Sequence, residues 1–137
     1  MVRSRLEQRN PYAGVPQRAW VTVRFVALDS TVVQLKLMVD TGCPCSLVVG
    51  SEFAAAFQHQ HAPDSMSNFG NLAGAWFQIQ LADIGLSVRV VGYGSEEVLR
   101  ASKQSHREFD GLIGLPLLRL CEYGGDRDYF WLREATR

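Results

Sequence analysis

The chain has 137 residues and no formal net charge, because 14 Lys and Arg residues balance 14 Asp and Glu residues. A chain of this length forms a single domain, here residues 1–137, and buries a sizeable core without disulfides or metals. Hydrophobic residues make up 47% of the chain and charged residues 20%, as in an ordinary globular protein. A balanced charge gives no general attraction for a polyanion, so we expect no nucleic-acid partner.

The three cysteines, Cys43, Cys45 and Cys121, are too few and too unevenly spaced for a disulfide framework or a zinc site. We therefore expect reduced, partly buried thiols and no bound metal or cofactor, with oxidation beside Asp40 as the alternative. The chain shows no apolar segment typical of a signal peptide and no run of membrane-spanning length. These features predict a cytoplasmic protein with no membrane partner.

Residues 1–18 are polar and basic and contain the breakers Asn10-Pro11 and Val15-Pro16. This composition predicts an N-terminal arm with little regular structure. Two interpretations stay open, namely a disordered tail, or an edge strand or arm in a subunit contact.

Beyond the arm, short runs of β-branched and aromatic residues alternate with turn residues, which indicates a mostly β domain. Strands are predicted at Ala19–Val26, Thr31–Val39, Leu47–Val49, Ala75–Leu81, Leu86–Val91, Phe109–Ile113, Cys121–Tyr123 and Tyr129–Leu132. One short helix is predicted over Glu52–Phe57, with its N-cap at Gly50-Ser51. A second is predicted over Pro116–Leu120, where the proline suits the first turn.

Three segments are predicted to lack regular structure. His59–Ser67 is polar and indicates a loop, so its two histidines are expected to be solvated and to bind no metal. Asn68–Gly74 contains two Gly and two Asn residues and suits a mobile hairpin tip. Tyr93–Arg107 is mixed and charged, which predicts a surface loop with at most one helical turn at Glu96–Arg100.

Two motifs carry the chemistry. Asp40-Thr41-Gly42 ends an apolar strand and is followed by Ser46 and a second apolar run. Further along, Asp110-Gly111-Leu112-Ile113-Gly114 is followed by Leu117-Leu118. An Asp–Gly turn alone is common, but the two motifs in this order are fairly specific.

Together these motifs resemble those of the retropepsin-like aspartic proteases, the retroviral proteases and their single-domain bacterial and eukaryotic relatives. The resemblance covers Ala19 to Leu132. It implies a mostly β acid protease fold, a closed β-barrel half with one or two short helices. It also implies a homodimer, because the chain contains a single Asp-Thr-Gly and a second copy would supply the second Asp40.

The resemblance further implies an endopeptidase that needs no cofactor. Asp40 of each chain would activate a water to hydrolyse a bond in an extended peptide or protein substrate. Thr41 would hydrogen-bond across the dimer axis, and the Gly42 amide would donate to the Asp40 carboxylate while leaving room for substrate. Ser46 would support the same loop.

The second motif and the glycine-containing hairpin receive roles by the same resemblance. Leu112 would line an apolar substrate pocket. Asp110 would belong to a supporting strand, and Gly111 and Gly114 would let that strand cross closely behind the active loop. Phe69–Gly74 would form a flap over the substrate. Its substrate-binding residues would be Gly70, Asn71, Leu72 and Ala73.

The chain also departs from the viral members of the family. Cys43 stands where the family usually has Ala or Ser, and Pro44 and Cys45 stand where viral members have acidic residues. Leu115-Pro116 stands where viral members have an Arg followed by a polar residue. Because the acidic residue and the Arg are both absent, neither charge is left without a partner. These changes predict a non-viral enzyme with more apolar pockets.

Two questions stay open at this point. The first is whether the chain is instead a catalytically weak or inactive peptide-binding or regulatory module on the same fold. The second concerns the aromatic terminal strand at residues 128–132, which would be hazardous as a free edge. It forms either an intersubunit sheet or a packed strand of the barrel.

Overall fold

The structure is a computed structural model that describes residues 5–67, 70–97, 100 and 109–135. This part of the chain is mostly β, with two short α-helices, α1 (Ser51–Phe57) and α3 (Leu115–Leu118), and a 3-10 turn, η1 (Ala82–Ile84). The strands are β1 (Glu7–Pro11), β2 (Trp20–Val26), β3 (Val32–Asp40), β4 (Leu47–Val49), β5 (Gln60–Ser67), β6 (Gly70–Leu81), β7 (Leu86–Gly94), β8 (Gly111–Gly114), β9 (Glu122–Gly125) and β10 (Tyr129–Arg133).

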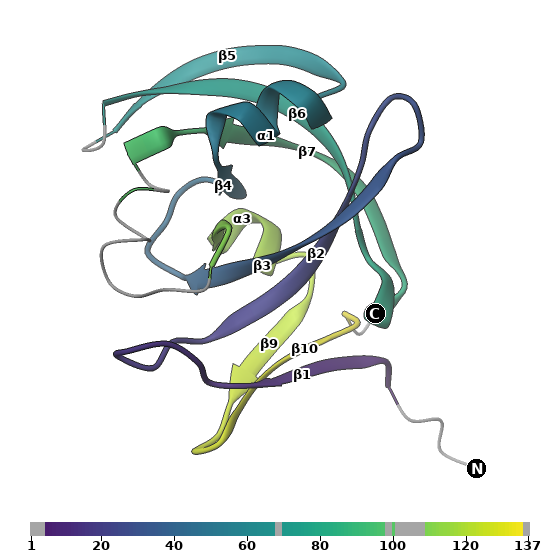
Figure 1. The fold of residues 1–137 in the computed structure, drawn as a ribbon. Coiled ribbons are helices and arrows are strands. Elements are labelled where there is room, and N and C mark those ends of the chain that lie inside the picture. The colour runs from purple at the N-terminus through teal and green to yellow at the C-terminus, as the bar shows by residue number, and fades with distance from the viewer. Residues whose placement is uncertain (1–4, 68–69, 98–99, 101–108, 136–137) are drawn as a thin grey trace.

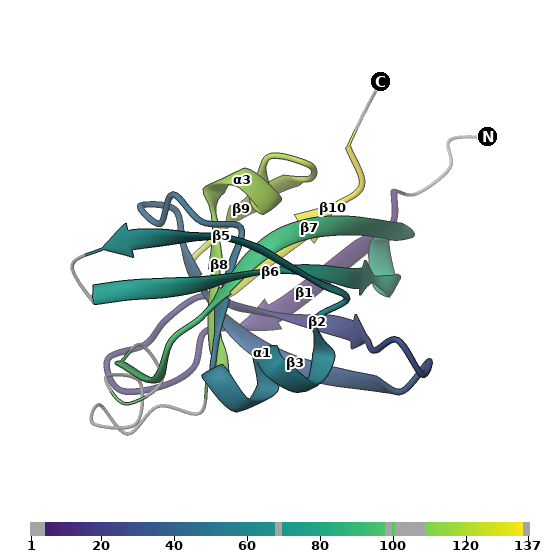
Figure 2. The same ribbon diagram turned by 90° about the horizontal axis from the view of Figure 1, so that it is seen from above.

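Six of the strands close into a barrel (Figure 1). Their order is β2-β3-β8-β4-β7-β6, and β6 pairs back with β2 at Arg24↔Gln80, Phe25↔Ile79 and Val26↔Gln78. β5 is added outside the closed ring and pairs with β6 alone. The two form a long hairpin that extends to one side when the molecule is seen from above (Figure 2). The prediction of a closed, mostly β barrel with short helices is therefore confirmed.

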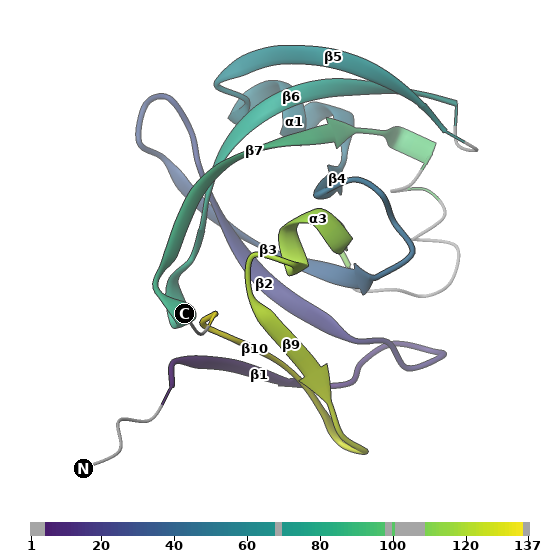
Figure 3. The ribbon, with the colours of Figure 1, turned by 180° about the vertical axis from the view of Figure 1, so that it is seen from behind.

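A smaller sheet of β1, β10 and β9 lies below the barrel (Figure 3). β10 is the central strand, and it pairs with β1 on one side and β9 on the other. The terminal aromatic strand thus pairs within its own chain, although in this small sheet and not as the predicted barrel strand. Its backbone groups are satisfied on both sides, so it presents no free edge.

The expectation of little regular structure before Ala19 is wrong for Glu7–Pro11, which form β1. The prediction failed because the buried position of this strand is occupied by the side-chain amide of Gln8 and not by an apolar residue. Gln8 is 5% exposed, donates to the Thr22 carbonyl at 3.1 Å and accepts from the Thr22 amide at 2.7 Å. Its side chain thereby imitates a strand's backbone and joins β1 to β2, while the alternating positions stay polar.

The loop predicted at His59–Ser67 is also a correction, because Gln60–Ser67 form β5. The strand is polar because it lies outside the barrel, and the register shifts between Ala62 and Ser65 where Pro63 interrupts the alternation. The prediction of a solvated side chain is wrong for His59, which is half-buried and whose ring donates to the Val26 carbonyl at 2.6 Å, and is confirmed for His61, which is exposed.

The remaining predicted elements agree with the structure to within a few residues. α1 begins at Ser51 rather than Glu52, and the Ser51 amide donates to the Glu96 carboxylate at 3.0 Å instead of being capped locally. β7 continues to Gly94, so the predicted surface loop begins later. Glu96, Glu97 and Arg100 are helical, and the rest of that segment up to Phe109 lies outside the described residues.

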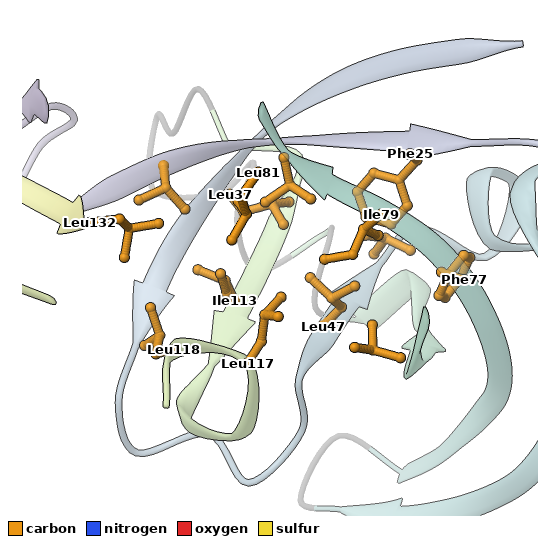
Figure 4. Packing of buried hydrophobic residues seen from close by; sticks show 14 of the residues in the cluster. Phe25, Leu37, Leu47, Phe77, Ile79, Leu81, Ile113, Leu117, Leu118 and Leu132 are labelled. Carbon is orange, nitrogen blue, oxygen red and sulfur yellow. The ribbon is translucent and has the colours of Figure 1, made fainter. Parts of the chain in front are cut away.

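The barrel interior is filled by apolar side chains at alternating strand positions, joined by two leucines of α3 (Figure 4). Phe25 links the barrel to α1, because its ring meets Phe53 and Phe77 edge-on at centroid distances of 5.0 and 5.5 Å. Phe53 in turn stacks on Phe57 at 4.3 Å. This core holds β3, β4 and β8 in fixed positions, and these strands carry the two sequence motifs.

Truncating the central ring tests this packing. Phe25 is fully buried, so we expect Phe25→Ala to lower the free energy of unfolding by about 3–5 kcal/mol in urea denaturation. The matched control is Leu28→Ala, since Leu28 is 72% exposed and its loss should cost less than about 0.5 kcal/mol. Similar values for both variants would contradict the core assignment.

Candidate functional site

Asp40 is the last residue of β3, where an apolar strand delivers a carboxylate into a tight turn. The turn closes through a hydrogen bond from the Cys43 amide to the Asp40 carbonyl at 3.0 Å. The Gly42 amide donates to Asp40 Oδ1 at 3.1 Å, which is the interaction expected of this glycine. Asp40 is half-buried, whereas Thr41 and Gly42 are exposed beside it. One carboxylate oxygen is thus fixed by the backbone.

β8 runs directly behind this loop. It pairs in parallel with β3, with Gly114 opposite Asp40, and antiparallel with β4, with Ile113 opposite Leu47. At its end, the Gly114 amide donates to the Ser46 carbonyl at 3.0 Å and the Leu115 amide to the Cys43 carbonyl at 3.1 Å. Both ends of the loop are therefore tied to one strand and cannot move independently.

Two glycines make this close passage possible. A Cβ on Gly111 would overlap the Val48 carbonyl oxygen, and one on Gly114 would overlap the carbonyl oxygen of Cys45 and lie 2.8 Å from that of Cys43. Real Cβ atoms do not approach backbone so closely, so any side chain would push the strand away from the loop. The supporting role inferred for these glycines agrees with this geometry.

Asp110 also has a structural role. Its Oδ2 accepts from the Lys36 backbone amide at 2.9 Å, and its own amide donates to the Lys36 carbonyl at 2.8 Å. These two bonds fix the start of β8 against β3. The Asp110 carboxylate is committed there and is not among the groups that surround Asp40.

A cleft of about 360 Å³ opens next to Asp40. One side of its lining comes from the loop of residues 40–45 and from β4. The rest comes from β8 and from the β5–β6 hairpin. The lining residues are Asp40, Gly42, Cys43, Pro44, Cys45, Val48, Ser65, Met66, Ser67, Leu72 and Leu112. Among the described residues, Asp40 is the only one of these that carries a carboxylate, and most of the others are apolar.

The cleft unites part of the predicted site. Leu112 and Leu72 line it together with Asp40 and Gly42. The other flap residues, Gly70, Asn71 and Ala73, belong to β6, so they form strand rather than a turn. They do not line the cleft. The hairpin turn at 68–69 lies outside the described residues.

Sequence reasoning missed the residues Ser65–Ser67, which supply the facing wall. Their polar composition predicts a loop, whereas in the structure Pro63-Asp64 forms a bulge within a strand. The dipeptide inserts one extra residue into β5, and Ser65 then pairs with Leu72, so the two share a face of the hairpin. A polar run followed by a glycine-containing strand could have signalled this hairpin.

Asp64 braces the hairpin from the bulge. Its two oxygens accept from the Asn71 side chain and from the Gly74 amide, each at 3.1 Å. The hydrogen bond from Asn71, followed by that from Gly74, lowers the pKa of the Asp64 carboxyl. Gly74 is itself in close contact with the bulge, because a Cβ there would overlap the Pro63 carbonyl oxygen. The wall facing Asp40 is thus held in a defined bend.

Comparisons with models of protein families, with curated proteins and with solved structures find no match for this chain. Within the described residues, no three His, Cys, Asp or Glu side chains are grouped so that they could hold a metal ion. The helices in the same residues are too short or too polar to cross a membrane. The chemistry of the site is therefore argued from its own geometry.

The passage of β8 behind the loop can be tested by adding one methyl group. We expect Gly114→Ala to destabilise the fold by about 1–3 kcal/mol, because the new Cβ has to displace the Cys45 carbonyl. Gly42→Ala is the control in the same loop, since its Cβ would meet Asp40 Oδ1 at an ordinary 3.4 Å. Equal unfolding midpoints in urea would contradict this account.

The hairpin brace predicts a pH dependence. Because the pKa of Asp64 is lowered, its carboxylate stabilises the hairpin fully above about pH 4 and loses this effect as the pH falls through the lowered pKa. We expect Asp64→Ala to speed hydrogen exchange of the Gly74 amide several-fold near neutral pH, and the difference from wild type to shrink in acid. Asp128→Ala, which removes an exposed carboxylate elsewhere, is the control. A difference that stays constant with pH would refute the brace.

Proposed function

We propose that the protein is an aspartic endopeptidase with the acid protease fold, acting as a homodimer in which each chain contributes Asp40. One observation carries the proposal: Asp40, fixed by the Gly42 amide, is the sole carboxylate in an otherwise largely apolar cleft of the described residues. Such a cleft suits the side chains of an extended peptide. The carboxylate is placed where the peptide's backbone would pass.

A second copy is needed for chemical reasons. Hydrolysis without a covalent intermediate requires one group to take a proton from water and another to donate a hydrogen bond to the scissile carbonyl. Asp110 cannot be that second group, because it is committed to the Lys36 amide. The exposed positions of Thr41 and Gly42 leave the loop accessible to the same loop of another chain.

The mechanism follows from two equivalent carboxyl groups. Held side by side, they cannot both ionise at low free-energy cost, so the pair shares one proton and titrates as a unit. The ionised Asp40 accepts a proton from the attacking water, and the protonated Asp40 of the other copy donates to the carbonyl oxygen. The Gly42 amide keeps the carboxylate oriented throughout.

The β5–β6 hairpin is the proposed flap. Ser65 and Leu72 share one face of the hairpin and line the cleft opposite the loop, so closure over a peptide would exclude water from the carboxyl pair. The Asp64 brace holds the bend of this hairpin at the bulge.

The dimer interface differs from the terminal-strand sheet that the resemblance implies. Both sides of β10 are already occupied by β1 and β9 of its own chain. The second copy would therefore approach the loop face, or the outer strands of the small sheet, rather than pair with β10.

A peptide-binding or regulatory module is the second candidate. It is favoured by the single carboxylate that one chain's cleft contains, since a monomer would hold an extended peptide without hydrolysing it. Cleavage and oligomeric state separate the two candidates.

Removing the carboxylate charge tests the proposal. We expect Asp40→Asn to lower cleavage of a peptide library by on the order of 10,000-fold at mildly acid and neutral pH, while the dimer persists on size exclusion. Asp83→Asn, a change at an exposed residue of η1, should cleave like wild type. Cleavage that survives Asp40→Asn would sink the mechanism, and a strictly monomeric active enzyme would sink the shared pair.

A further inference from the structure

Two thiols lie next to each other in the wall of the cleft. Cys43 and Cys45 flank Pro44 in the active loop, and both are free, half-buried and part of the lining. The Cys43 thiol donates to the Cys45 carbonyl oxygen at 3.6 Å. Cys121 is buried in the turn after α3 and is no part of the cleft.

The spacing of the pair permits a direct bond. Adjacent Cα atoms are about 3.8 Å apart, so residues two positions apart span at most roughly 7 Å, and less where the chain bends. The chain bends at Pro44 and Cys45. Disulfides accept Cα separations of about 4.4–6.8 Å, which a bent Cys-Pro-Cys segment can reach.

We propose that Cys43 and Cys45 are a modification site, a dithiol that a peroxide oxidises to an intrachain disulfide and that a dithiol reductant restores. The site takes a small oxidant, hydrogen peroxide or an organic hydroperoxide, which reaches it through the cleft. Its chemistry is independent of peptide hydrolysis.

The oxidation proceeds in two balanced steps. The Cys43 thiolate attacks the terminal oxygen of the peroxide and the O–O bond breaks. The leaving hydroxide, or the alkoxide when the oxidant is an organic hydroperoxide, takes a proton to become water or an alcohol. Cys43 is then a sulfenic acid, and its sulfur has lost two electrons to the peroxide. The Cys45 sulfur attacks it, the S–S bond forms, the S–O bond breaks, and the second hydroxide leaves as water with the Cys45 proton.

The two thiols differ in their suitability for these steps. Burial, followed by the charge of Cys43 and a hydrogen bond with it, raises the pKa of Cys45 to about 11. Because the thiolate is the nucleophile, the first attack falls to Cys43. Once Cys43 is a neutral sulfenic acid, its charge no longer opposes ionisation of Cys45, which can then act as the resolving thiol.

The disulfide would also reach Asp40, a consequence that rests on the proposed function. The Cys43 amide and carbonyl bond to Asp40 and Leu115, and the Cys45 carbonyl lies against Gly114. Joining the two sulfurs at about 2.05 Å constrains the backbone that carries these groups. A shift of about 1 Å in a catalytic group can cost on the order of 100-fold in rate.

The test is to treat the intact protein with hydrogen peroxide, block free thiols under denaturing conditions, and map disulfides by peptide mass spectrometry. We expect a Cys43–Cys45 disulfide that forms readily and is reversed by dithiothreitol, with Cys121 still reduced. Cys43→Ser and Cys45→Ser should each abolish it. A pair that stays reduced, forms only bonds between chains, or oxidises no faster than Cys121 would overturn the proposal.

Two further arms keep the outcomes separate. A Cys121→Ser variant should form the same disulfide, and thermal unfolding of each serine variant checks that the fold is retained. If wild type cleaves peptides, oxidation should lower the rate by roughly 10- to 100-fold and the Cys43→Ser variant, which lacks the thiol that peroxide attacks, should be insensitive. If no peptide is cleaved although the disulfide forms, the proposed function fails and the modification site stands.

Discussion

The passage of β8 between β3 and β4 is the constraint on which the site depends. β8 comes from a distant part of the chain, and the carbonyl groups of the Asp40 loop rest on Gly114 with no room for a side chain. The hydrogen bonds that tie the loop to Gly114 and Leu115 remove its freedom before any ligand arrives. Such preorganisation is what a carboxylate needs if it is to act at a fixed point.

The hairpin of β5 and β6 completes the cleft from outside the barrel. Its polar strand has one neighbour only, and its bend depends on the extra residue at Pro63 and on the two hydrogen bonds accepted by Asp64. The loop that carries Asp40 forms one wall of the cleft, and the braced hairpin forms the other. The loop that carries Asp40 also carries Cys43 and Cys45, so the proposed oxidation site and the carboxylate share one loop.

The sequence predicted the barrel well because its inward positions are apolar and alternate, as Phe25 on β2 and Ile79 on β6 illustrate. It could not predict β1, where the buried position is Gln8 and the binding partner is the backbone of Thr22. Propensity also failed for β5, since an edge strand with a bulge needs neither alternation nor apolar residues. The motif around Asp40 could be recognised because its tight turn is formed by consecutive residues and closed by the hydrogen bond from the Cys43 amide to the Asp40 carbonyl.

The central claim is that Asp40 is half of a site completed by a second copy of the chain. Its most direct test is the stoichiometry with which a statine-type peptide, a mimic of the hydrolysis transition state, binds in isothermal titration calorimetry. A site built across a two-fold axis predicts one peptide bound per two chains, together with a species of dimer mass in analytical ultracentrifugation. Binding of one peptide to each chain, with a monomer in the centrifuge, would contradict the account.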